Sequence, residues 1–273
     1  MGLFGSKENP EDLMYHAMSL MEKGQPKAAI TLFSKVIKKD SRNTSAIYNK
    51  GLALNQLKKY SDAVTCFYLV LQQNPTDSQA HNNKGIAMAE MGNIQGAIEC
   101  YDKAIEVDSK NSASYFNKGV LLDRLQEFED AIECLDKAIS TDPKKINAMF
   151  YKGIVLGKLK KHEEALNCFE SVCKKNPTHM DSLFHKGIEY AELGNHEKAI
   201  EIFDKILTNH KDNVNIIYAK ARSKAAIGED AESIELLRRA ISSSGKTIRE
   251  WAKNEKIFEK LHNNNQFRKL VKI

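Results

Sequence analysis

The chain has 273 residues, of which 42% are hydrophobic and 28% charged, and it carries a formal net charge of +5. This composition is typical of a soluble protein with a packed interior. No apolar run approaches the roughly 20 residues that a membrane-spanning helix needs, and the first residues lack the basic and apolar regions of a cleavable signal peptide. We therefore expect a cytoplasmic protein.

Residues 1–9 precede any periodic pattern, and we expect them to form a flexible N-terminal leader. The first six residues, Met1 to Ser6, match the myristoylation pattern MGxxx[ST]. Such a short match is common by chance, and one myristoyl chain alone binds membranes only marginally. Membrane attachment is therefore not our expectation, and acylation of Gly2 stays an open alternative.

From residue 10 the sequence repeats with a period of 34 residues. A glycine recurs at this step, and an alanine follows each glycine after 12 residues: Gly51, Gly85, Gly119, Gly153 and Gly187, with Ala63, Ala97, Ala131, Ala165 and Ala199. A period between 20 and 50 residues indicates a solenoid, a propeller or an array. Numbering each unit from 1 to 34, with the glycine at position 8, gives units 10–43, 44–77, 78–111, 112–145, 146–179, 180–213 and 214–247.

Each unit contains two amphipathic stretches of helical length, separated by a short break and closed by a polar turn. Lys58-Lys59 and Gly92-Asn93 are examples of the break, and Pro75, Pro143 and Pro177 occupy the closing turn. Proline cannot continue a helix, and no segment alternates with the period of a strand. The pattern predicts an all-α fold in which the glycine of the first helix faces the alanine of the second. Large apolar residues, such as the one at position 24, complete the core.

The unit resembles the tetratricopeptide repeat, and the segments from Ala46 to Gly51 and from Ala97 to Ala104 are typical of it. The resemblance implies a right-handed superhelical solenoid of about seven helix pairs. The end units depart from the pattern, with Ala17 and Ala221 at the glycine position and Ser233 at the alanine position. Such departures are expected where a repeat lacks one neighbour.

Residues 248–273 do not follow the repeat and resemble a C-terminal capping segment. Their apolar residues are spaced as in two short helices separated by asparagines, and we expect Trp251, the single tryptophan, to pack onto the last repeat. Residues 246–273 hold eight basic and three acidic side chains, and therefore account for the whole net charge of +5. We interpret this charge as a solvated outer face, with an acidic partner or anionic lipid as the alternative.

In the family, the first helices line a concave groove that binds peptides. Carrying the groove positions onto this chain gives candidate ligand-binding residues that are mostly aromatic or asparagine: Tyr48, Asn49, Asn83, Phe116, Asn117, Phe150, Tyr151, Phe184, His185 and Tyr218. An asparagine can donate to and accept from a peptide backbone at once. We expect a peptide ligand with apolar anchors. The lysine at position 5 and the arginine at position 6 of the family's carboxylate clamp are missing, so an acidic chaperone tail is not expected.

Other classes of function have less support. No nucleophile elbow, HExxH motif or phosphate loop is present, and His162-Glu163-Glu164 lacks a second histidine one turn later. We therefore expect no enzyme, no catalytic residue, no metal site and no cofactor. Four cysteines follow the repeat, and we interpret them as small core residues. A nucleic-acid-binding helical-repeat protein and a self-associating assembly protein stay as alternatives, although Arg124, Lys158 and Arg222 are balanced by nearby acids.

Overall fold

The computed structural model describes residues 9–272, all of them in helices, turns or short connections. The predicted leader up to residue 8 and the acylation pattern at Gly2 lie outside the described residues. The chain divides into two compact units, residues 1–144 and 145–273, here called the N-terminal and C-terminal units. The all-α repeat fold predicted from the sequence is confirmed.

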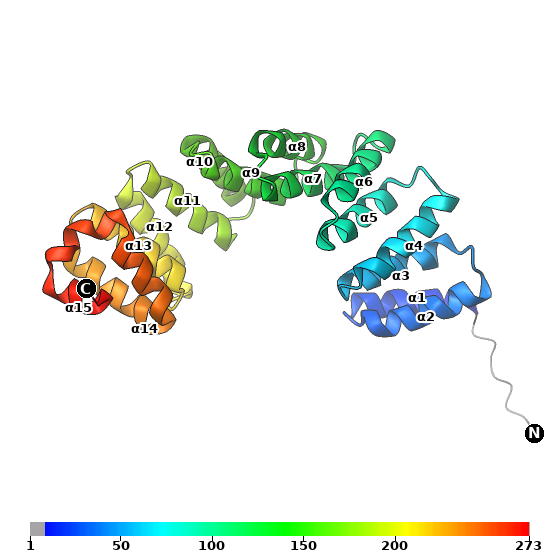
Figure 1. Cartoon of the computed structure of the whole chain (residues 1–273), viewed down its shortest axis with the longest axis horizontal. Helices are drawn as coiled ribbons and strands as arrows, with labels where there is room; N and C mark the ends of the chain where they lie inside the picture. Colours follow the sequence, from blue (N-terminus) through cyan, green and yellow to red (C-terminus); the bar gives the residue numbers. More distant parts are fainter. Residues whose placement is uncertain (1–8, 273) are drawn as a thin grey trace, which may run out of the picture. The chain divides into compact units, whose positions relative to one another are not determined.

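The N-terminal unit contains four helix pairs (Figure 1). They are α1 (Pro10–Glu22) with α2 (Pro26–Lys39), α3 (Thr44–Gln56) with α4 (Tyr60–Gln73), α5 (Ser78–Glu90) with α6 (Ile94–Val107), and α7 (Ser112–Arg124) with α8 (Phe128–Thr141). Each first helix begins at the first residue of a 34-residue unit, and within this unit each helix from α1 to α7 packs against the next one along the chain.

The C-terminal unit contains three further pairs and a terminal segment. The pairs are α9 (Ile146–Lys158) with α10 (His162–Lys175), α11 (Met180–Glu192) with α12 (His196–Asn209), and α13 (Val214–Ala226) with α14 (Asp230–Asn254). The 3-10 helix η1 (Lys256–Asn263) and α15 (Asn265–Val271) follow. In the described residues of both units, no helix is long and apolar enough to cross a membrane.

The helix ends follow from local chemistry at two positions of the repeat. At position 34, polar side chains cap the next first helix: Oδ1 of Asn43 and of Asp77 each accept a hydrogen bond from a backbone N–H at 2.9 Å. At position 15, the backbone is left-handed in every repeat, at Gly24, Lys58, Gly92, Gln126, Lys160, Gly194 and Gly228. This conformation ends the first helix and turns the chain into the second.

In the repeats that carry it, the recurring glycine makes room for the large residue at position 24. A Cβ atom on Gly187 would lie 2.5 Å from the ring of Phe203, and one on Gly85 would lie 2.6 Å from the ring of Tyr101. The alanine at position 20 is fully buried in each of the first six repeats. The sequence therefore predicted the close approach of the two helices correctly. The side chain that the glycine accommodates, however, is the large residue at position 24 and not the alanine at position 20.

Helix α14 runs without interruption through residue 247, where the sequence places the end of the array. It has no proline at the turn position, and Ile241, Ile248 and Ala252 bury themselves on one side of it. Phe258 from η1 and Phe267 from α15 complete this core at 0% exposure. The apolar face of the last helix pair is thus covered by the chain's own terminal segment.

Candidate functional site

In the N-terminal unit, the candidate residues form hydrogen bonds between neighbouring repeats. Asn83 donates from Nδ2 to the hydroxyl of Tyr48 at 2.9 Å, and Asn117 donates from Nδ2 to Oδ1 of Asn82 at 2.9 Å. Position 5 of one repeat is thus joined to position 6 of the next. Asn49 instead donates to the backbone carbonyl of Ser45, within its own helix, at 2.9 Å.

The sequence reasoning missed the other members of this network. Gln79 accepts a hydrogen bond from the Tyr48 hydroxyl at 3.3 Å, and Ser114 donates to Asn82 at 3.2 Å. Asn82 is 7% exposed and stands at position 5, where most repeats carry an aromatic residue or methionine. A polar residue at that position was the available signal for a polar interaction between repeats.

Two hollows adjoin this network. One, of about 410 Å³, is lined by Tyr48 from α3, by Gln79 and Asn83 from α5, and by residues at the start of α7. The other, of about 120 Å³, lies between α5 and α7 over Ala89, beside Asn117. Since a water molecule takes about 30 Å³, the smaller hollow can hold a short aliphatic side chain.

In the C-terminal unit, the candidate residues form an aromatic cluster. The ring of Phe150 lies 5.8 Å from that of Tyr151 and 5.7 Å from that of His185. His185 also stacks on Phe169 at 5.4 Å and contacts Phe184 at 5.4 Å. Burial lowers the pKa of His185, although Asp181 opposes this effect. The imidazole is therefore neutral at neutral pH, and the cluster carries no charge there.

Tyr218 does not belong to an open surface, because the terminal segment covers it. It is 8% exposed and packs against Trp251 and Phe258 at ring distances of 5.8 and 5.9 Å. Its hydroxyl donates to Glu255, and burial raises the Tyr218 pKa, as does that hydrogen bond. Trp251 packs onto the last repeat as predicted but stays 49% exposed.

Tyr218 thus serves the packing of the terminal segment. The other nine candidates, Phe116 among them, are half-buried.

The charged residues near the candidate positions are paired. Arg124 lies 3.5 Å from Glu90, and Arg222 lies 3.2 Å from Glu192 and 2.5 Å from Glu255. The sequence predicted that nearby acidic residues offset these two arginines, and in the structure each arginine forms an ion pair with a glutamate.

The histidine of the zinc-like sequence at 162–164 has a structural role. Nδ1 of His162 lies 2.7 Å from Oε2 of Glu189, a carboxylate that is 5% exposed. Burial raises the pKa of Glu189, and the hydrogen bond with His162 opposes this effect. Within residues 9–272, no group of three or more metal-ligating side chains comes together.

Comparison with protein families supports the repeat assignment along most of the chain. Residues 15–118 match the N-terminal repeat region of Psidin, and residues 90–172 match subunit 3 of the anaphase-promoting complex, or cyclosome. Residues 152–214 match a model of the tetratricopeptide repeat itself. A comparison with curated proteins finds no match.

Solved structures share the fold at low sequence identity. The chain resembles a repeat protein from Parabacteroides merdae with a TM-score of 0.63 and 17% identity, over 97% of this chain and 99% of the other. PilW, a type IV pilus biogenesis factor, gives a TM-score of 0.67 and 18% identity, over 76% of this chain and 96% of PilW. YrrB, a repeat protein with an unusual peptide-binding site, gives 0.57 and 23%, over 69% of this chain and 97% of YrrB.

Proposed function

The chain is a tetratricopeptide-repeat protein, and we propose that it is a non-enzymatic interaction scaffold whose first helices bind a peptide segment of a partner protein. The proposal rests on two asparagine side chains in the N-terminal unit, whose amide NH₂ groups donate hydrogen bonds while their oxygens stay available as acceptors. Asn83 and Asn117 donate to neighbouring residues, but among residues 9–272 no donor reaches Oδ1 of either one. These oxygens can accept hydrogen bonds from the backbone N–H groups of a bound peptide.

The hollow over Ala89 supports apolar anchoring next to these acceptors. Its lining includes the apolar residues Ile86, Ala89 and Val120 together with Asn117, and the Arg124–Glu90 ion pair also borders it. A peptide that hydrogen-bonds to Asn117 would place a neighbouring side chain over these apolar residues. In the C-terminal unit, the neutral cluster around Phe150 and His185 offers aromatic faces for larger apolar anchors.

The electrostatics favour a ligand without a strong charge. Arg124 and Arg222 already have carboxylate partners, and none of the candidate residues is a lysine or arginine. A terminal carboxylate beside acidic side chains needs several cations to bind it. We therefore infer that the ligand is not an acidic chaperone tail. Among the structures that share the fold, YrrB is described as having a peptide-binding site, which is consistent with a peptide ligand here.

The test uses substitutions that fill the face without removing packing. Ala89→Arg and Ala191→Arg would project long side chains from half-buried positions on the first helices, at position 12. Phe150→Ala is a poorer choice because it would also remove ring contacts with Phe169 and His185. Matched controls place the same side chain on exposed positions of the second helices, as in Gln72→Arg and Glu201→Arg.

Peptides selected from a random display library on the wild-type protein provide the ligand. We expect Ala89→Arg to weaken binding of peptides that dock on the N-terminal unit at least tenfold, Ala191→Arg to do the same for peptides on the C-terminal unit, and both controls to leave binding unchanged. Equal binding by all four variants would remove the proposal. Self-association, the alternative role, would appear as a mass increase in sedimentation that the blocking variants abolish. Binding to nucleic acid would instead fall steeply with salt.

A further inference from the structure

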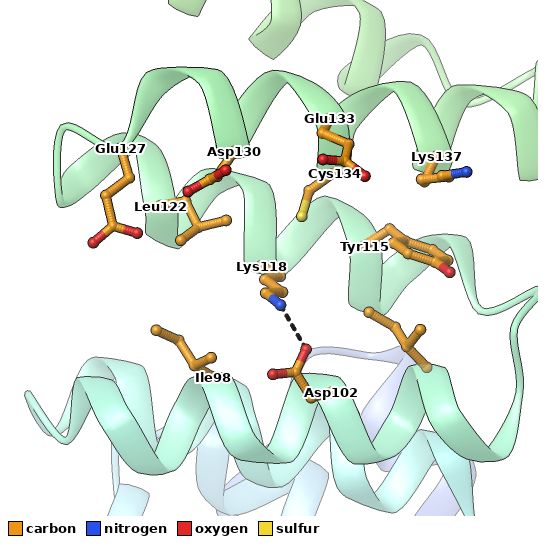
Figure 2. Close-up of a pocket in the computed structure, with 11 residues that line it drawn as sticks. Ile98, Asp102, Tyr115, Lys118, Leu122, Glu127, Asp130, Glu133, Cys134 and Lys137 are labelled. Atoms are coloured by element: carbon orange, nitrogen blue, oxygen red, sulfur yellow. Dashed lines mark hydrogen bonds and ion pairs between the residues drawn. The ribbon is translucent and has the colours of Figure 1, made fainter.

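A cleft of about 480 Å³ opens between α6 and α8, above α7 (Figure 2). Ile98 from α6 and Leu122 from α7 form an apolar part of the cleft, beside the ion pair of Lys118 with Asp102. The upper wall is α8, with Asp130 and Cys134 directed into the opening. Glu127 stands at the start of that wall. The cleft is lined mainly by second helices, whereas the proposed peptide-binding face is on the first helices.

The corresponding place in the C-terminal unit, between α12 and α14, is filled by the chain itself. Lys224, at position 11 of its repeat, places Nζ 2.5 Å from Oε2 of Glu229 and 2.9 Å from Oε2 of Glu232. These carboxylates stand at positions 16 and 19. A second ammonium, that of Lys220 at position 7, pairs with Asp204 at position 25 at 2.7 Å.

The α6–α8 cleft has carboxylates at the same two repeat positions, but it lacks the ammonium group at position 11. Glu127 and Asp130 stand at positions 16 and 19, and Lys118 at position 7 pairs with Asp102 at position 25 at 2.6 Å. Position 11 is Leu122. Within the described part of the chain, no ion pair joins a cation to Glu127 or Asp130, and the cleft is open beside them.

Two other interfaces between repeats fill this place with different side chains. Between α4 and α6, Met88 occupies position 11 and contacts the thiol of Cys100, while Tyr68 lies beneath Nζ of Lys84 at 5.8 Å. Between α10 and α12, position 11 is Tyr190, whose hydroxyl donates to Glu170 at 3.0 Å. At the α6–α8 interface, positions 11 and 25 hold Leu122 and Asp102, and a cleft remains beside them.

We propose that the α6–α8 cleft is a second docking site, which binds a basic peptide segment of a partner protein. A lysine or arginine of the partner takes the place that Lys224 has in the C-terminal unit, between Glu127 and Asp130. An apolar side chain next to it lies on Ile98 and Leu122. Glu133, further along the same wall, adds to the negative charge that attracts the basic segment. Lys137 on that wall offsets part of this charge, but the four acidic residues of the lining outnumber its two lysines.

The first test uses short fluorescein-labelled peptides and fluorescence anisotropy. One peptide alternates leucine and lysine, a second alternates leucine and glutamate, and a third alternates serine and lysine. The cleft should bind the first peptide best. Glu127→Gln combined with Asp130→Asn should weaken its binding about tenfold. The matched control, Glu99→Gln with Glu129→Gln, removes two exposed carboxylates outside the cleft and should leave binding unchanged.

A second variant tests the comparison with Lys224 directly. Leu122→Lys should place an ammonium between the two carboxylates and compete with the ligand, weakening binding at least tenfold while the protein stays folded. At the same position of the last repeat, the fold accommodates Lys224 with its side chain only 12% exposed. If Leu122→Lys fails to fold, the substitutions at the exposed Glu127 and Asp130 decide the question.

Cysteine alkylation locates the bound peptide on the wild-type protein. Cys134 lines the cleft, and Cys66 is the equivalent residue of an earlier repeat. The leucine–lysine peptide should slow alkylation of Cys134 by N-ethylmaleimide and leave Cys66 unaffected, and Ala89→Arg should not change this protection. The proposal is overturned if the peptide does not bind, if all variants bind it equally, or if Cys134 gains no protection.

Discussion

The contact between Gly187 and Phe203 gives the sharpest test of how the repeats are packed. A Cβ atom at residue 187 would lie 2.5, 3.0 and 3.1 Å from three ring atoms of Phe203, where ordinary contacts are 3.4–4 Å. The ring would have to retreat by roughly 1 Å, and it has no free space because Phe203 is 0% exposed.

Gly187→Ala therefore combines two opposing effects. Overpacking a core costs about 1–3 kcal/mol, whereas alanine in a helix is favoured over glycine by about 0.5–1 kcal/mol. We expect a net loss of about 1–2 kcal/mol in the free energy of unfolding, measured by urea denaturation followed by circular dichroism. Unfolding at the same or higher urea concentration would refute the reasoning.

Two further variants isolate the ring contact. Gly96→Ala is the matched control, because its Cβ would meet only the ends of the Asn93 and Met88 side chains, at 2.8 and 3.0 Å. The preference of a helix for alanine and the small displacement of these two flexible side chains oppose each other, so stability should change by less than about 0.5 kcal/mol. Combining Gly187→Ala with Phe203→Leu copies the natural pair of Ala221 with Leu237 in the last repeat, where both residues are 0% exposed. The double variant should be more stable than the sum of the single effects by at least about 0.5 kcal/mol.

Three other predictions follow from single positions. Lys160 has a φ of +58°, so Lys160→Gly should raise the free energy of unfolding by about 0.5–1 kcal/mol, whereas Lys161→Gly should not. Burial lowers the pKa of His185. The stability that its neutral ring contributes is therefore present above about pH 6.5 and is lost as the pH falls. His185→Phe should reduce the difference in Tm between about pH 7 and pH 5. Tyr218→Phe removes the hydrogen bond to Glu255 and should cost about 0.5–1.5 kcal/mol in urea unfolding followed by tryptophan fluorescence. Unchanged values in these three measurements would contradict the corresponding contacts.

The sequence predicted the fold well because the repeat encodes it locally. The glycine at position 8 and the break at position 15 each act within one helix pair, so their spacing alone indicates the structure. The residue that contacts the glycine was harder to predict, because the ring of Phe203 reaches Gly187 from another helix. The length of α14 was also hidden, since the sequence Ser242-Ser243-Ser244-Gly245 favours an end that tertiary packing overrides.

The candidate site was only partly predictable. Family positions indicated which residues belong to the first helices, but not which of them join neighbouring repeats. Tyr48 and Asn83 bond to each other, and Tyr218 is covered by the terminal segment, because these contacts depend on residues far away in the chain. The α6–α8 cleft was not predicted at all. It becomes visible only when Leu122 is compared with Lys224 at the same repeat position in the structure.

The most direct test of the central claim is a binding measurement on the first-helix face. Peptides selected on the wild-type protein are titrated by calorimetry into wild-type, Ala89→Arg and Gln72→Arg proteins, all checked for equal folding. The account predicts that Ala89→Arg weakens binding at least tenfold, whereas Gln72→Arg binds like the wild type. Equal affinity for all three proteins would contradict a peptide-binding role for this face.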